Sequence, residues 1–124
     1  MFSITPRIRQ DLDVVTIEGK EYVVGYKVVT EDMRSLGLRN NPNILTFRQG
    51  RWVDLSPDKI VPGKADYGGI WLAVSRGNAN RLKTYMGETY EEHTRIFRTI
   101  TRDVLFHNNY RMKTSGVKLL EEIK

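Results

Sequence analysis

The chain has 124 residues, 40% of them hydrophobic, and a formal net charge of +5, which is enough apolar material for one domain with a single core. It contains no cysteine, and this excludes disulfide bonds, thiolate zinc sites and a cysteine nucleophile. No apolar run approaches the roughly 18 residues of a transmembrane helix, and the N-terminal residues lack the apolar segment of a signal peptide. We therefore expect a single cytoplasmic domain, residues 1–124, that does not enter the membrane.

The first third of the chain predicts a hairpin and a short helical turn. β-Branched residues lie on both sides of Glu18 and Gly19 in the segment 14–29, a pattern typical of two strands joined by a tight turn. The segment 30–38 opens with Thr30, a residue that caps helices, and carries acidic residues just after it. We expect one short helical turn there.

The next segments predict a second hairpin and an irregular loop. Apolar residues in 44–55 lie on both sides of Gln49 and Gly50, which predicts two strands with a turn at that pair. The segment 56–69 holds two prolines and three glycines, so it is expected to form a loop without regular structure.

A buried strand and a capped helix come next. The run "IWLAV" (70–74) is continuously apolar, as in a strand covered on both faces. Ser75 or Asn78 can cap the helix that follows, and the apolar residues up to about Tyr90 recur at helical spacing.

The last part of the chain predicts two strands and a final helix. The segment 95–107 is rich in β-branched and aromatic residues, and 110–114 predicts another strand after a turn at two asparagines. The segment 115–124 has the apolar spacing of a short amphipathic helix. The expected fold class is α+β, with a mixed, mostly antiparallel sheet and two helices in the C-terminal half.

The stretch "DYGGIWLAVSRGN" (66–78) has the appearance of a phosphate-binding loop. Its two glycines precede the strand, whereas a dinucleotide-binding fingerprint places them after it. Gly68 and Gly69 are therefore interpreted as a flexible strand entry or a close approach of another backbone. The segment Ser75–Asn78 follows the strand and starts a helix, so its free N–H groups can cap the helix and also favour an anion.

Positive charge is concentrated in the middle of the chain. Residues 35–83 carry eight basic and three acidic side chains, while 1–34 and 84–124 are nearly balanced. A local positive field favours phosphate-bearing partners, either a nucleotide or a nucleic acid; a solvated basic surface is the alternative. Arginine and aromatic residues also recur together in 38–52, 95–102 and 106–113, with asparagine in the first and the last of these segments. This recurrence predicts a polar cleft suited to a base and a phosphate.

Catalytic and metal motifs are not found in the sequence. His93 and His107 have no carboxylate at a metal-ligand spacing, so no metal site is expected. The carboxylates of "GETYEEH" are interpreted as a solvated turn, and no serine, histidine and aspartate set can be nominated. We therefore predict no catalytic residues.

The order of elements resembles the ADP-ribosyltransferase-like fold, in which a split β-core grips NAD. "GYKVV", "GGIWLAVSRGNANRLKTYM" and "TRIFRTITRDVLF" carry this resemblance, which covers roughly residues 25–106. It implies a polar ligand-binding residue on the first core strand, a Tyr or Ser near the second strand–helix unit, and a late catalytic Glu. Small binders of this kind also occur among phage and mobile-element proteins that capture nucleotide signals.

Three positions of this chain correspond to that pattern. Lys27 occupies the place of the first polar residue, and Trp71 and Ser75 lie where the Tyr or Ser is expected. No Glu lies between residues 95 and 118, and Asp103 is the nearest substitute for the catalytic acid. This departure favours a binding protein over a transferase, with NAD or an ADP-ribose-like molecule as the ligand that the resemblance implies.

The sequence thus predicts a small, non-enzymatic protein that binds a phosphorylated nucleotide-type ligand in a basic cleft. The alternatives are an NAD-dependent ADP-ribosyltransferase-like enzyme, a nucleic-acid-binding protein, and a homodimeric interaction module. The candidate ligand-binding residues are Lys27, Arg39, Asn40, Arg48, Trp71, Ser75, Arg76, Asn78, Arg81, Arg98, Asn108 and Arg111.

Overall fold

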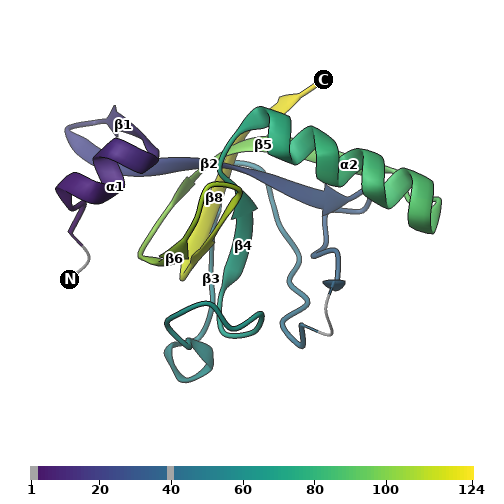
Figure 1. Ribbon diagram of the computed structural model, residues 1–124, viewed down its shortest axis with the longest axis horizontal. Coiled ribbons are helices and arrows are strands. Elements are labelled where there is room, and N and C mark those ends of the chain that lie inside the picture. The colour runs from purple at the N-terminus through teal and green to yellow at the C-terminus, as the bar shows by residue number, and fades with distance from the viewer. Residues whose placement is uncertain (1–2, 39–40) are drawn as a thin grey trace.

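The computed structural model describes residues 3–38 and 41–124 (Figure 1). Its regular elements in chain order are α1 (Pro6–Asp11), β1 (Asp13–Ile17), β2 (Lys20–Thr30), β3 (Trp52–Asp54), the 3-10 helix η2 (Pro57–Lys59), β4 (Ile70–Ala73), α2 (Arg76–Tyr90), β5 (Thr94–Thr101), β6 (Val104–His107), β7 (Arg111–Thr114) and β8 (Gly116–Ile123).

The eight strands of the described residues belong to one sheet, and every pairing in it is antiparallel. The strand order is β3-β8-β5-β2-β4-β7-β6, and β1 pairs with β2 outside this path. The longest strand, β2, pairs along most of its length with β5. The fold is therefore a single α+β domain, and the sheet is more uniform than the mixed sheet expected from the sequence.

Local sequence signals predicted the central elements correctly. β1 and β2 form the first hairpin, and its turn residues Glu18 (φ 51°) and Gly19 (φ 79°) both have positive φ, as a tight two-residue hairpin turn requires. The run at 70–74 forms β4, and Ser75 caps α2, because its Oγ accepts a hydrogen bond from Asn78 N (3.2 Å). The segment predicted as strand over 95–107 is divided between β5 and β6.

The prediction of a second helix in the C-terminal half is wrong, because residues 116–123 form β8 between β3 and β5. The register of β8 against β5 shifts between Leu119 and Glu121, so that Leu120 is an extra residue in the strand. A β-bulge of this kind places adjacent apolar residues in a strand and breaks the period of two. The apolar positions of β8 consequently have intervals that imitate those of a helix: Val117, Leu119, Leu120 and Ile123.

Two other predictions in the first half are also corrected. Residues 44–55 do not form a hairpin, because β3 pairs with β8 and Thr46 makes only an isolated bridge to Arg34. The expected helical turn after Thr30 is a non-helical turn, closed by a hydrogen bond from Arg34 N to Thr30 Oγ1 (2.9 Å). The short helix α1 was not predicted, since its six residues are too few to show a helical period.

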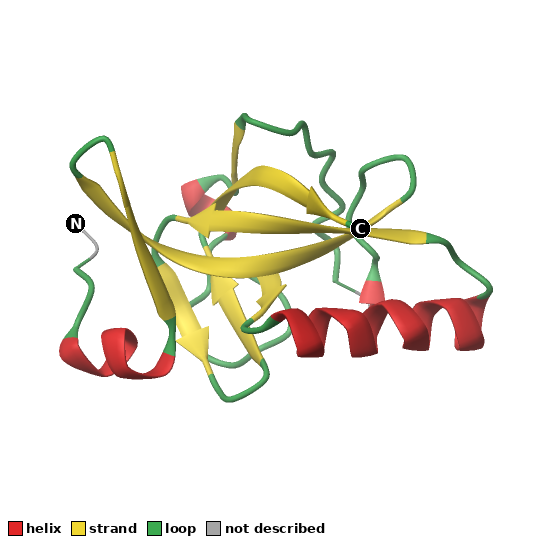
Figure 2. Cartoon of the chain, turned by 90° about the horizontal axis from the view of Figure 1, so that it is seen from above, coloured by secondary structure: helices red, strands yellow, loops and turns green. Residues whose placement is uncertain are grey.

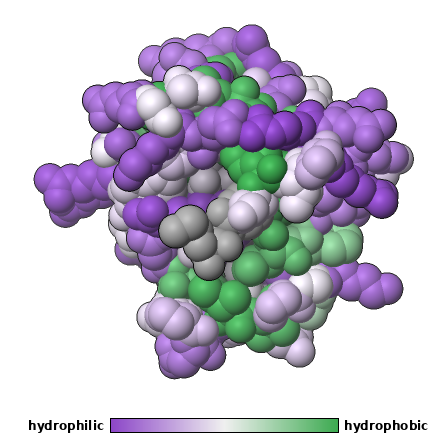
Figure 3. Space-filling model, turned by 90° about the vertical axis from the view of Figure 1, so that its left-hand side faces the viewer, coloured by the Kyte–Doolittle hydropathy of each residue, from purple (hydrophilic) through white to green (hydrophobic). Residues whose placement is uncertain are grey.

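The two faces of the sheet carry separate apolar clusters. α2 packs along one face, where Ala79 meets Val28 and Ile96 (Figure 2). The larger cluster contains Phe97 and Met112 from the sheet, together with residues from outside it such as Ile8 of α1. The side of the molecule that carries α1 and β1 is mostly hydrophilic, with hydrophobic patches between the polar side chains (Figure 3). No helix among the described residues is long and apolar enough to cross a membrane.

The sheet divides between β2 and β4. These strands pair at one position, Tyr26 with Ala73, whereas β4 continues with four paired residues on β7. Figure 1 shows β4 descending away from β2 below this point. The divergence leaves the residues of β2 just beyond Tyr26 without a paired strand on that side, and the space is available for side chains.

Substitution of Gly69, with Gly87 as a control, tests the packing beside β4. Gly69 is buried, and a Cβ there would collide with the side chain of Lys113, so Gly69→Ala should lower the free energy of unfolding by about 2–4 kcal/mol. Gly87 lies in α2 with open space around it, and Gly87→Ala should raise that free energy by about 0.5–1 kcal/mol. Urea denaturation of both variants measures the changes, and equal stabilities would contradict the close approach at Gly69.

Candidate functional site

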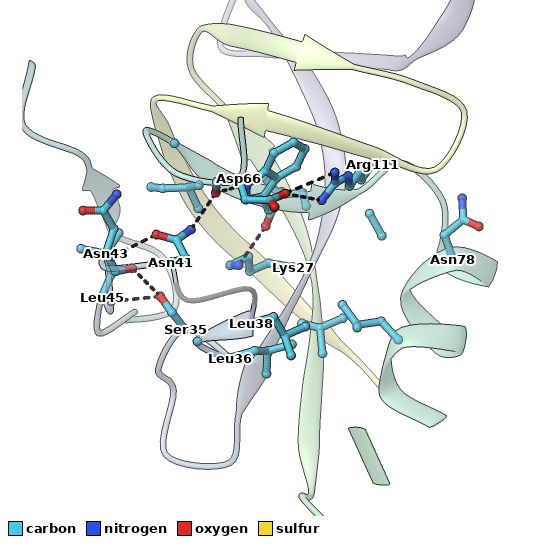
Figure 4. Close-up of a pocket in the computed structure, with 18 of the residues that line it drawn as sticks. Lys27, Ser35, Leu36, Leu38, Asn41, Asn43, Leu45, Asp66, Asn78 and Arg111 are labelled. Atoms are coloured by element: carbon cyan, nitrogen blue, oxygen red, sulfur yellow. Dashed lines mark hydrogen bonds and ion pairs between the residues drawn. The ribbon is translucent and has the colours of Figure 1, made fainter. Parts of the chain in front are cut away.

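A cavity of about 370 Å³ lies beside the divergence of β2 and β4 (Figure 4). Side chains from β2, β4, the beginning of α2 and the segments 35–38 and 41–45 line it. Leucine and isoleucine side chains form much of the wall, and a small number of polar groups lie among them. This combination of size, apolar walls and few polar groups is typical of a small-molecule site.

Lys27 is the buried cation of the cavity. It lies on β2 with 8% of its surface exposed, and its Nζ donates a hydrogen bond to the Trp71 carbonyl of β4 (2.8 Å). Nζ also lies 5.4 Å from the ring centroid of Phe47. Because burial disfavours the charged amine, the pKa of Lys27 is lowered to about 8.

Asp66 and Arg111 form the polar wall opposite the leucines (Figure 4). The Arg111 guanidinium lies 3.4 Å from Asp66 Oδ1 and stacks on the Trp71 ring, 4.0 Å from its centroid. The Asp66 carbonyl accepts hydrogen bonds from Trp71 Nε1 (2.8 Å) and Asn41 Nδ2 (3.2 Å). Trp71 is thus held in place on several sides, and one of its faces is covered by Arg111.

The loop that carries Asp66 is anchored from inside by Lys113. This lysine is completely buried, and its Nζ donates to the carbonyls of Val61 (2.6 Å), Ala65 (3.1 Å) and Tyr67 (3.1 Å). Burial lowers the pKa of Lys113, and the negative charge of Asp66 raises it in part. The three acceptors satisfy all three ammonium protons, which makes Lys113 a structural residue.

Polar side chains stiffen the opposite rim. Ser35 Oγ accepts a hydrogen bond from Leu45 N (2.9 Å), and Asn41 Oδ1 accepts one from Asn43 N (2.9 Å). All four residues line the cavity. The rim is therefore shaped by its own hydrogen bonds before any ligand arrives.

Five of the predicted binding residues come together in this cavity. The pairing of β7 with β4 brings the strand that starts at residue 111 alongside the strand that carries residue 71. The five lie far apart in the sequence but converge from β2, β4, α2 and β7: Lys27, Trp71, Asn78, Arg81 and Arg111.

The other predicted residues lie elsewhere. The Ser75 hydroxyl is used in capping α2, and Arg76 and Arg48 are exposed. Arg98 lies 3.7 Å from Glu121 across the β5–β8 pair, and Asn108 Oδ1 accepts hydrogen bonds from the turn that begins β7. Arg39 and Asn40, also predicted, lie outside the described residues.

The sequence reasoning missed several members of the site. Asp66 was assigned to an irregular loop. Asn41 and Asn43 belong to the segment 38–52, which was noted for its arginine, asparagine and aromatic residues, but of its three asparagines only Asn40 was nominated. Tyr110 lines the cavity and is 63% exposed. The cluster of three asparagines was a usable signal for the rim, but nothing in the local sequence shows that Asp66 lies next to Arg111.

The charged groups among the described lining residues are mostly cationic. Lys27, Arg81 and Arg111 are cationic, and Asp66 is the single carboxylate among them. Asp103, the substitute proposed for a catalytic acid, is exposed on the connection between β5 and β6. Within the described residues no three histidine or carboxylate side chains are grouped to hold a metal ion.

Comparisons of the chain with protein-family models, with curated proteins and with solved structures find no match. The class of this protein is therefore defined by its own features. It is an α+β domain with an antiparallel sheet and a cationic cavity at the point where two central strands separate.

Replacement of Lys113 should loosen the loop around Asp66. Lys113→Met leaves three carbonyl groups without their donor, so the free energy of unfolding should fall by about 2–4 kcal/mol. Amide hydrogen exchange in 56–69 should become faster. Lys64→Met changes an exposed lysine of the same loop and should alter stability by less than about 0.5 kcal/mol. Equal effects of the two variants would refute the anchoring role.

The lowered pKa of Lys27 predicts a pH dependence of stability. Between pH 8 and the ordinary lysine value of 10.5, the unfolded chain binds more protons at this residue than the folded chain, so this contribution to stability rises with pH across that window. Relative to Lys27→Met, the wild-type protein should gain about 3 kcal/mol between pH 7 and pH 10.5. Urea denaturation of both proteins across this range measures the difference, and a constant difference would contradict the assignment.

Proposed function

We propose that this protein binds a small phosphorylated ligand of the nucleotide type, without need of a catalytic step. The single observation that carries the proposal is the cavity of about 370 Å³, in which three cationic side chains meet an apolar wall. Pockets of this size enclose small organic molecules and orient them by a few polar groups.

The arginine side chains of the cavity can hold the anionic group of the ligand. Arg111 reaches the cavity from β7 and keeps its guanidinium in a fixed position between Asp66 and Trp71. Arg81 reaches it from the second turn of α2, and no ion pair is formed by its side chain within the described chain. Since guanidinium groups match the oxygens of a phosphate in geometry and charge, these two residues are the best candidates to hold it.

The apolar wall of the cavity can contact the uncharged part of the ligand. Leu36, Leu38 and Leu82 contribute aliphatic surface, and the exposed ring of Tyr110 lies at the rim. A flat, weakly polar group such as a nucleobase gains from contact with both kinds of surface. The side-chain amide of Asn43 also lines the cavity, and it can both donate to and accept from the edge of such a group.

Binding is favoured over NAD-dependent transfer by the state of the carboxylates. Asp66 is the single acidic side chain among the described lining residues, and it is ion-paired with Arg111. Its carboxylate is thus already engaged by a guanidinium of the protein. NAD and ADP-ribose are therefore considered as bound ligands and not as substrates.

Ligand binding can be measured by thermal unfolding with AMP, ADP-ribose, NAD and a cyclic nucleotide, with adenosine as the unphosphorylated control. A ligand present at 100 times its Kd should add about 2.7 kcal/mol to the stability. Arg81→Gln should weaken binding about tenfold or more, because it removes a charge-assisted contact. Arg48→Gln, at an exposed position outside the cavity, should leave the affinity unchanged.

Two outcomes would contradict the proposal. The first is the failure of every phosphorylated compound to stabilise the protein at millimolar concentration. The second is an equal loss of affinity in the Arg81 and Arg48 variants, which would indicate binding through the general charge of the protein.

A further inference from the structure

The two buried lysines of this protein differ in how their amines are satisfied. Lys113 Nζ donates to three carbonyl oxygens and is enclosed by them. Lys27 Nζ has one hydrogen-bond acceptor among the described residues, the Trp71 carbonyl, and its other neighbour is the ring of Phe47. An ammonium group forms three such bonds when it is fully satisfied. The amine of Lys27 is therefore free to interact with a further group.

That further group can come from the cavity. Lys27 lies on β2, where its backbone pairs with Phe97 of β5, so its position is set by the centre of the sheet. Its side chain lies between Asp66 and Arg111 on one side and Leu36 and Leu38 on the other (Figure 4). An amine held on a rigid strand inside a mostly apolar site is well placed to react with a bound molecule.

Burial also changes the protonation state of this amine. With a pKa of about 8, about a fifth of Lys27 is neutral at pH 7.4, compared with about 0.1% of an ordinary lysine. Only the neutral amine is a nucleophile, so Lys27 has a far larger reactive fraction than a lysine with the ordinary pKa.

We propose that Lys27 captures a small anionic aldehyde as a reversible imine. The Nζ lone pair attacks the aldehyde carbon, and one proton moves from nitrogen to the former carbonyl oxygen to give a carbinolamine. The second nitrogen proton then follows, so that the oxygen leaves as water while the C=N bond forms. No oxidant or reductant is consumed. This inference rests on the proposed function, because the anionic group of the aldehyde occupies the place near Arg81 and Arg111 assigned there to a phosphate.

Pyridoxal 5′-phosphate serves as the probe, because it joins an aldehyde to a flat ring and a phosphate. The protein is incubated with it at pH 7.4 and reduced with borohydride, which converts the imine to a stable amine, and the modified lysines are located by peptide mass spectrometry. Lys27 should be modified at least about tenfold more than Lys20, an exposed residue at the beginning of the same strand. The yield at Lys27 should rise with pH and level off at a lower pH than the yield at Lys20, because burial lowers the pKa of Lys27.

Matched variants separate capture from binding. Lys27→Arg keeps the positive charge and cannot form an imine, so it should lose the dominant adduct. Lys20→Met should keep that adduct. Circular dichroism of both variants confirms that they are folded. Pyridoxine 5′-phosphate, which has an alcohol in place of the aldehyde, should protect Lys27 from modification and form no adduct.

The outcomes distinguish the two proposals. If pyridoxine 5′-phosphate stabilises the protein while pyridoxal 5′-phosphate modifies Lys27 no more than Lys20, imine capture is refuted and ligand binding stands. If Lys27 is modified selectively but pyridoxine 5′-phosphate neither binds nor protects, imine capture stands and the phosphate-binding role of the cavity fails. The absence of both effects would overturn both.

Discussion

The hydrogen bond from Lys27 Nζ to the Trp71 carbonyl joins two strands that have stopped pairing through their backbones. In a continuous sheet a main-chain N–H of the neighbouring strand would donate to that carbonyl. Here β2 and β4 pair only at Tyr26 and Ala73, and a side chain completes the contact. The separation creates room for a cavity inside the sheet, and it also places an amine in that cavity. The cavity and its amine thus both arise at this one point of the sheet.

A second lysine keeps the surrounding loop in place. Lys113 collects three carbonyl groups of the segment between η2 and β4, a segment with little regular structure to satisfy them. Gly69 permits this arrangement, since any side chain there would occupy the path of the Lys113 side chain. The loop in turn positions Asp66, which contacts Arg111 and Trp71. The buried ammonium of Lys113 therefore fixes the loop that forms the polar wall of the cavity.

The groups of the cavity have opposite effects on the pKa of Lys27. Its apolar wall lowers the pKa of Lys27, while Arg81 and Arg111 can attract an anion that would favour the charged amine again. Binding of a ligand with an anionic group would consequently be accompanied by proton uptake at Lys27, whereas formation of an imine would consume the neutral amine. Both responses follow from the same placement of one amine among leucines and arginines.

Short-range signals in the sequence determined the first hairpin, β4 and the capped start of α2. The turn residues Glu18 and Gly19 adopt the positive φ of a tight turn, and the hydroxyl of Ser75 caps the helix that follows it. Each of these effects acts over only a few residues. The sequence also nominated Lys27, through the family resemblance, and Arg111, through the recurrence of arginine with asparagine and aromatic residues, and both line the cavity.

Tertiary structure alone decided the state of residues 116–123. β3 and β5 pair with both sides of this segment, and the bulge at Leu120 accommodates a spacing that by itself favours a helix. The cavity was decided at the same level. Its walls come from segments far apart in the chain, and only the separation of β2 and β4 brings them together.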